Sequence, residues 1–129
     1  MILDTDILIA LMQGKEAANK AMQNLEERGE RVATTIISAY ELLKGADVSS
    51  RPERNITKVE DLLSNIEVLD LTLQACREAS VIYREMEKAG CPIGEFDVLI
   101  AAIARTHNET IMTRDKHFTL IRKASVVNW

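Results

Sequence analysis

Two aspartates lie inside an apolar run at the start of the chain, which begins MILDTDILIA. Ile2 and Leu3 precede Asp4, and aliphatic residues follow Asp6, so the run has the pattern of a buried core segment. An unpaired charge in such a place is expensive. The folded chain must therefore supply a partner that compensates the charges of these two acids.

Short apolar stretches alternate with longer amphipathic ones along the chain, and this alternation predicts an α/β fold. We expect strands over 1–4, 31–35, 66–71 and 110–113, with a possible fifth over 125–127. We expect helices over 5–12, 15–29, 38–44 with Gly45 ending it, 52–64, 73–89 and 95–106. Helical connections of this length imply a short, mainly parallel sheet with helices on both faces. Such sheets place their chemistry at the carboxyl ends of the strands.

Composition limits the class of protein. No linker or internal repeat interrupts the 129 residues, so we expect one domain over 1–129. The longest apolar run, at 98–104, is too short to span a bilayer, and we expect a cytoplasmic protein. Cys76 and Cys91 match no metal or redox spacing and are expected to be reduced and structural. A net charge of -4 argues against a generic basic nucleic-acid binder, but not against a local site.

Four carboxylates fall near the predicted strand ends. Asp4 ends the first strand, Glu41 and Asp97 lie in the first turns of two helices, and Asp115 follows the fourth strand. All four should point to one edge of the sheet. Hard divalent cations such as Mg²⁺ and Mn²⁺ prefer oxygen ligands, and carboxylates that repel one another become favourable around a cation.

Three of these acids have simpler interpretations as well. Glu41 completes the capping box Ser38-Ala39-Tyr40-Glu41, and Asp97 could merely complement a helix dipole. Asp115 could be an ordinary turn residue. Asp4 is the strongest single candidate, because a charge at the end of a buried parallel strand has few structural uses. The metal-site hypothesis depends on the agreement of all four.

Four motifs resemble those of PIN-domain ribonucleases in order and spacing, most closely the VapC toxins of prokaryotic toxin–antitoxin pairs. They are LDTDILIALMQG, ISAYELLKG at 37–45, PIGEFDVLIAAIA at 92–104 and TIMTRDKHF at 110–118. The resemblance implies a PIN-like three-layer α/β/α fold and a metal-dependent endoribonuclease, usually homodimeric and inhibited by a VapB-type antitoxin. The family's acidic residues fall on Asp4, Glu41, Asp97 and Asp115, and its supporting hydroxyl on Thr113.

One position departs mildly from the family, which commonly has Asn or Ser where this chain has Asp6. Asp6 could add charge to the metal site or simply cap the helix that it begins. His117 is expected to be a surface or substrate-contact residue rather than a general base. Basic residues that could bind an RNA backbone are Lys44, Arg51, Arg54, Arg114, Lys116, Arg122 and Lys123.

Three alternatives to the ribonuclease stay open at this point. A phosphatase of the haloacid-dehalogenase type would use Asp4 as nucleophile and Asp6 as general acid. A catalytically inactive PIN-fold binding module would keep the acids for structure, and a receiver-like signalling domain would need a lysine after the late strand. The apolar positions of 52–64 and 73–89 suggest that a second subunit covers part of one face, and hence a homodimer.

Overall fold

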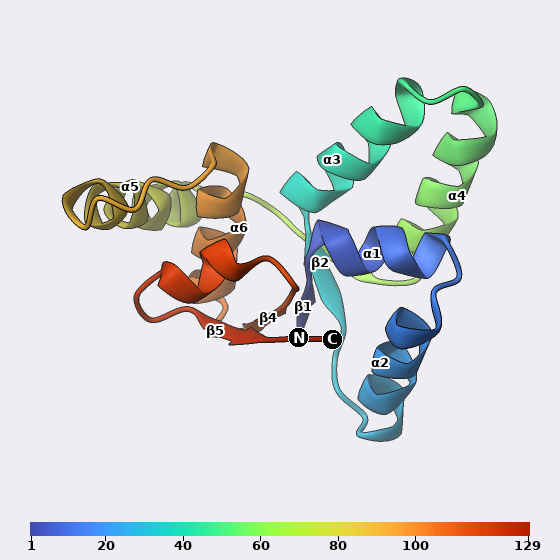
Figure 1. Cartoon of the computed structure of the whole chain (residues 1–129), viewed down its shortest axis with the longest axis horizontal. Helices are drawn as coiled ribbons and strands as arrows, with labels where there is room; N and C mark the ends of the chain where they lie inside the picture. Colours follow the sequence, from blue (N-terminus) through green and yellow to red (C-terminus); the bar gives the residue numbers. More distant parts are fainter.

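The computed structural model describes residues 1–129 and has a short parallel sheet at its centre (Figure 1). Five strands pair in the order β3-β2-β1-β4-β5, and every neighbouring pair is parallel. Their bounds are Ile2–Leu3 (β1), Ala33–Thr35 (β2), Glu67–Leu69 (β3), Thr110–Met112 (β4) and Ser125–Val127 (β5). The parallel sheet and its fifth strand are as the sequence predicts, and β1 lies in the middle.

Helices cover both faces of this sheet (Figure 1). They are α1 (Thr5–Met12), α2 (Glu16–Glu27), α3 (Ile36–Asp47), α4 (Pro52–Ser64), α5 (Leu73–Lys88) and α6 (Glu95–Thr106), followed by the 3₁₀ helix η1 (Lys116–Leu120). The helices α5 and α6 pack on one face, and α1 to α4 lie on the other. The predicted three-layer α/β/α architecture is confirmed.

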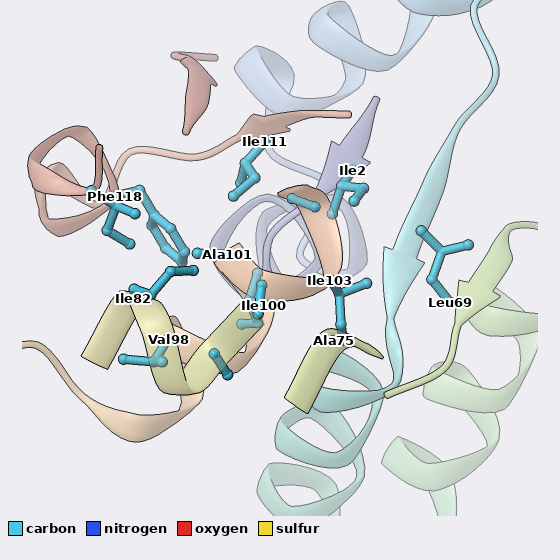
Figure 2. Packing of buried hydrophobic residues seen from close by; sticks show 14 of the residues in the cluster. Ile2, Leu69, Ala75, Ile82, Val98, Ile100, Ala101, Ile103, Ile111 and Phe118 are labelled. Carbon is cyan, nitrogen blue, oxygen red and sulfur yellow. The ribbon is translucent and has the colours of Figure 1, made fainter. Parts of the chain in front are cut away.

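Neighbouring side chains of a strand belong to two different hydrophobic cores, one on each face of the sheet. Ile2 and Ile111 belong to the core beneath α5 and α6, whereas their neighbours Leu3 and Met112 belong to the core beneath α1 to α4. Successive strand residues point to opposite faces, and a sheet covered on both faces is apolar on both. Figure 2 shows Ile100, Ala101 and Ile103 of α6 within the first core. The apolar run at 98–104 is thus a buried helix.

Several helix boundaries differ from those predicted from the sequence. The helix α3 begins at Ile36 and runs through Gly45 to Asp47, because Thr35 rather than Ser38 is its N-cap. Gly45 has an ordinary helical backbone and does not end the helix. The helix η1 was not predicted. Cys76 is a free cysteine on the exposed side of α5, since the buried stripe of that helix consists of Ala75, Ala79, Ile82 and Met86.

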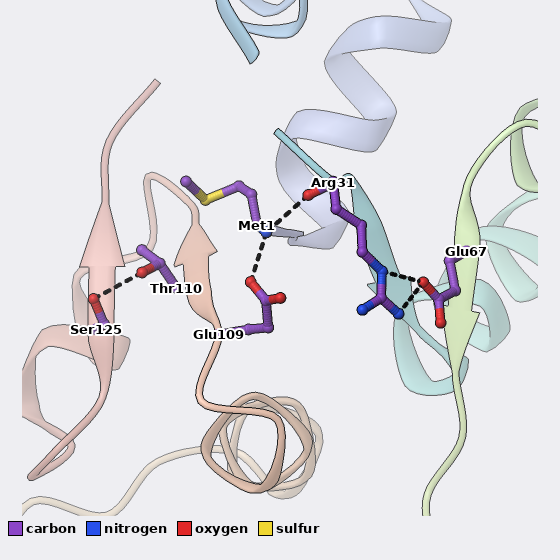
Figure 3. Close-up of polar contacts among 6 residues, drawn as sticks. All are labelled: Met1, Arg31, Glu67, Glu109, Thr110 and Ser125. Atoms are coloured by element: carbon purple, nitrogen blue, oxygen red, sulfur yellow. Dashed lines mark hydrogen bonds and ion pairs between the residues drawn. The ribbon is translucent and has the colours of Figure 1, made fainter. Parts of the chain in front are cut away.

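Polar contacts join all five strands at the amino edge of the sheet (Figure 3). Arg31 Nε lies 2.6 Å from Glu67 Oε2, which links β2 to β3. The Met1 amino group donates to the Arg31 carbonyl at 3.0 Å and to Glu109 Oε2 at 2.6 Å, which links β1 to β2 and β4. The hydroxyls of Thr110 and Ser125, 2.9 Å apart, link β4 to β5.

The apolar residues that suggested a second subunit are largely used within the chain. In α4, Val59 is buried, and Ile56, Leu62 and Leu63 pack against the core beneath α1 to α4. The inward stripe of α5 belongs to the other core. The homodimer therefore stays a prediction. No helix of the chain combines the length and the apolar character needed to cross a membrane.

We expect Ile103→Ala to lower the free energy of unfolding by about 2 to 5 kcal/mol, because it leaves a cavity in a closely packed core. Ile103 is completely buried between α5 and the sheet (Figure 2). The matched control is Leu73→Ala, since Leu73 is 87% exposed on α5 and should change stability by less than about 0.5 kcal/mol. Urea unfolding measures both, and equal losses in the two variants would contradict this packing.

Candidate functional site

The strand order reverses direction beside β1. From β1 the chain crosses to β2 and then β3, and it later returns to β4 on the other side of β1. Ligands of open parallel sheets bind outside the carboxyl ends of the strands at such a switch point. Asp4 follows β1, Thr35 ends β2, and Thr113 follows β4. The sheet thus brings three polar residues to this point.

Asp4 is the buried acid of the group. It is 6% exposed, its Oδ2 accepts a hydrogen bond of 2.8 Å from the Thr113 hydroxyl, and its backbone N–H donates to the Met112 carbonyl at 3.1 Å. The pKa of the Asp4 carboxyl is raised to about 7, mainly by burial and to a smaller extent by the charges of Asp6 and Asp97, while hydrogen bonds from the Thr113 hydroxyl and the Thr5 backbone lower it. The carboxylate form of Asp4 therefore lacks compensating positive charge.

The Thr113 hydroxyl connects two of the predicted acids. Its oxygen donates to Asp4 and accepts a hydrogen bond of 2.9 Å from the backbone N–H of Asp115. Thr113 is itself buried, so this contact is shielded from water. One hydroxyl thus contacts both the carboxylate after β1 and the turn after β4. The supporting role of Thr113 in a metal site stays a prediction.

Glu41 does not form the predicted capping box. The amide of Ser38 donates to Thr35 Oγ1 at 3.1 Å, because α3 starts earlier than the capping box requires. Glu41 Oε1 instead accepts a hydrogen bond of 2.9 Å from the Thr5 hydroxyl. The capping interpretation of Glu41 is therefore wrong. Thr5 was not predicted from the sequence as a partner of Glu41, although its position between Asp4 and Asp6 places it close to the predicted site.

Asp97 and Asp115 lie together with His117. One ligand atom from each of the three residues lies within 4.8 Å of the others. Asp115 Oδ1 accepts a hydrogen bond of 2.9 Å from the backbone N–H of His117 and lies 2.9 Å from His117 Nδ1. The pKa of Asp97 is raised by burial and then by the charges of Asp115 and Glu41, while His117 lowers it. His117 is exposed, as expected, but it faces the acids.

Asp6 has a role distinct from that of Asp4. Its Oδ2 accepts the backbone N–H of Arg114 at 2.7 Å and lies 3.3 Å from the Thr113 hydroxyl. Its Oδ1 accepts the indole N–H of Trp129 at 3.2 Å. Asp6 is not the N-cap of α1, which is Asp4. Asp6 therefore holds the turn after β4 against Trp129, a residue that sequence reasoning missed.

The basic residues proposed as RNA contacts differ in their surroundings. Lys44 lies over the rings of Tyr40 and Phe96. The Arg114 guanidinium lies 3.7 Å from the Trp129 ring centroid, and its Nε donates to the Trp129 carbonyl at 2.8 Å. Arg51 belongs to the connection between α3 and α4, and this connection lies away from the sheet (Figure 1). Lys116 is exposed in η1.

The donor set fits a divalent cation. Asp4, Glu41, Asp97 and Asp115 offer carboxylate oxygens, which are the ligands that hard cations prefer. Two of these acids have raised pKa values, in each case partly because other carboxylates lie near. A bound cation would offset that repulsion.

Comparison with known proteins identifies the family. A family model described as PIN domain matches residues 1–124. The chain belongs to the PIN-domain family. This PIN domain is 33% identical over 114 residues to the tRNA(fMet)-specific endonuclease VapC of Shigella flexneri, with 88% of this chain and 85% of the relative covered. It is 31% identical to the tRNA(fMet)-specific endonuclease VapC of Salmonella typhimurium, with 99% and 96% covered.

Solved structures agree with this assignment. The PIN domain superimposes on one chain of VapBC2 from Rickettsia felis, bound to a DNA fragment from the promoter, with a TM-score of 0.92 and 27% identity. The alignment covers 99% of this chain and 97% of the other. DNA-bound VapBC from Salmonella typhimurium gives a TM-score of 0.90 at 30% identity, covering 99% and 96%. The resemblance to VapC proteins found in the sequence is thereby confirmed.

We expect the stability of this PIN domain in chelator to fall as the pH rises through the interval set by Asp4. Below the ordinary pKa of 3.8 the carboxyl is protonated in both the folded and the unfolded chain. Between that value and about 7 only the unfolded chain ionises, so the free energy of unfolding decreases. Above about 7 the loss is complete.

The Asp4→Asn variant isolates this effect because it has no charge to bury. Wild type should lose roughly 3 to 4 kcal/mol more than the variant between about pH 4 and about pH 7. Urea unfolding in EDTA at several pH values measures the difference. If the free energy of unfolding changed with pH equally in the two proteins, ionisation of Asp4 would not destabilise the folded state and the prediction would be wrong.

Proposed function

We propose that this PIN domain is a metal-dependent endoribonuclease, the toxin of a type II toxin–antitoxin pair. The observation that carries the proposal is the gathering of carboxylates at the switch point of the sheet, in a chain whose relatives are named VapC endonucleases and ribonucleases. RNA is its substrate. Crystal structures of similar chains are of VapBC complexes, and a VapB-type antitoxin is the proposed partner.

The proposed ligands of one or two Mg²⁺ or Mn²⁺ ions are Asp4, Asp97 and Asp115, with Glu41 reaching the ion or the attacking water from α3. A cation held by these residues would lower the pKa of bound water and offset negative charge on the phosphate. Thr113 orients Asp4 and Asp115, and Thr5 orients Glu41 through Oε1. Glu41 Oε2 can then accept a hydrogen bond from the water that attacks phosphorus.

The surroundings of Asp6 disfavour the phosphatase alternative. A general acid must deliver a proton to a leaving group, whereas both carboxylate oxygens of Asp6 accept hydrogen bonds from Arg114 and Trp129. The inactive binding module is disfavoured by the raised pKa of Asp4, because a structural acid gains nothing from burial beside other acids.

Purified protein freed of antitoxin should cleave RNA in Mg²⁺ or Mn²⁺ and stop in EDTA. Asp97→Asn removes a proposed metal ligand, so cleavage should fall by about a hundredfold or more. The substitution also removes one negative charge from a group of carboxylates that repel one another, so the thermal midpoint in EDTA should rise by about 2 to 8 °C. Gel assays and melting curves measure these effects.

Added Mn²⁺ provides the control for this prediction. It should stabilise wild type by about 2.7 kcal/mol at a hundredfold excess over the dissociation constant, and Asp97→Asn by less. Undiminished cleavage in EDTA would refute the metal site. An equal response of both proteins to Mn²⁺ would make Asp97 a helix-dipole residue only.

Comparison of Asp4→Asn with Asp6→Asn separates the ribonuclease from the phosphatase. Asp4→Asn removes a proposed ligand and should abolish RNA cleavage. Asp6→Asn can keep the hydrogen bond from Arg114 but sets an amide N–H against the Trp129 indole, so it should cost about 1 kcal/mol of stability and leave most cleavage. Hydrolysis of a phosphomonoester by wild type, lost in both variants, would favour the phosphatase.

A further inference from the structure

An aromatic pair bridges α3 and α6 beside the proposed catalytic acids. The ring centroids of Tyr40 and Phe96 lie 5.7 Å apart, and the rings meet edge to face at 87°. Tyr40 directly precedes Glu41, and Phe96 directly precedes Asp97. The pair therefore lies at the rim of the site, on the two helices that contribute Glu41 and Asp97.

Tyr40 keeps about half of its surface exposed although it packs against another aromatic ring. Phe96 is half-buried, whereas Tyr40 is 52% exposed even though it contacts Phe96. A tyrosine that served only the core would bury most of its ring. The contact with Phe96 instead limits where the ring can lie, while part of it stays open to solvent.

Lys44 adds a positive charge to this pair. It follows Tyr40 by one helical turn, and its Nζ lies 5.4 Å from the Tyr40 centroid and 5.2 Å from that of Phe96. Its ammonium makes no ion pair with a carboxylate. The two rings therefore position a cation whose charge is free to attract an anion.

We propose that Tyr40, Phe96 and Lys44 form a stacking platform for one unpaired nucleotide of the RNA next to the cleaved bond. The base stacks on the Tyr40 ring, which Phe96 supports, and the neighbouring phosphate binds Lys44. This proposal rests on the ribonuclease function and specifies which part of the RNA the site requires. A base inside a duplex has no free face, so the platform selects unpaired RNA.

The free positive charge of Lys44 favours RNA as the occupant. The net charge is -4, and the four acids repel a phosphate backbone, so local cations must attract it. Arg114 is already held by Trp129, and Arg51 lies beyond α3, as the N-cap of α4. Lys44 is the predicted RNA contact that combines a free charge with an exposed aromatic ring.

The test measures the affinity of a fluorescein-labelled single-stranded RNA by anisotropy in EDTA, where cleavage is suppressed. Tyr40→Ala should weaken binding about tenfold, and Tyr40→Phe should keep it, because stacking requires the ring and not the hydroxyl. Lys44→Ala should reduce the slope of log affinity against log salt by about 0.7. The control is Tyr83→Ala, since Tyr83 is 47% exposed on α5 and should bind RNA like wild type.

Two outcomes would overturn the platform: Tyr40→Ala binding RNA as tightly as wild type, or Tyr83→Ala being weakened as much as Tyr40→Ala. Light scattering tests whether a second copy of the chain occupies the patch instead. If wild type is a dimer, and Tyr40→Ala is a monomer with unchanged RNA affinity, the patch is a contact between two copies. Circular dichroism checks that each variant is folded. Absence of cleavage by wild type in Mg²⁺ and Mn²⁺, with Tyr40-dependent binding intact, would refute the ribonuclease but support the platform.

Discussion

The burial of Asp4 at the end of the central strand is the constraint on which the site depends. Because β1 has a neighbour on each side and helices over both faces, the carboxylate after it is removed from most of the surrounding water. The Thr113 hydroxyl lowers the cost only in part, and the pKa of Asp4 stays raised. A cation would resolve this conflict better than a proton near neutral pH, since it would also offset the charges of Asp97 and its neighbours.

Asp4 and Asp6 show how helical geometry gives similar residues different tasks. They are separated by one residue, yet Asp4 faces Thr113 and the acids, whereas Asp6 faces the backbone of Arg114 and the indole of Trp129. The first residue precedes α1 and the second lies in its first turn, so their side chains leave the backbone in different directions. Asp6 thereby positions the turn that carries Thr113 and Asp115.

Much of the fold could be predicted from the sequence, because alternation between strands and amphipathic helices depends on local pattern. The start of α3 could not, since Thr35 and Ser38 are both good caps and only the end of β2 decides between them. Asp4 and Asp115 could be placed at the carboxyl edge from strand ends, whereas Glu41 and Asp97 could be placed there only from the predicted starts of two helices. Because α3 begins at Ile36, Glu41 lies beyond the first turn of its helix. The contacts of Thr5 and Trp129 could not be predicted, because each joins segments that are far apart in the sequence. The same holds for the approach of His117 to Asp97.

The two ends of the sheet have different roles: polar contacts at the amino edge hold the strands together, and the carboxyl edge carries the candidate site. Every neighbouring pair of strands is joined at the amino edge by an ion pair or hydrogen bond (Figure 3). Asp4 and Asp115 lie at the opposite end, after β1 and β4. The carboxyl ends can therefore vary in their loops and side chains without loosening the strand order. A chain built in this way can acquire preferences for new RNA targets while its scaffold is inherited unchanged.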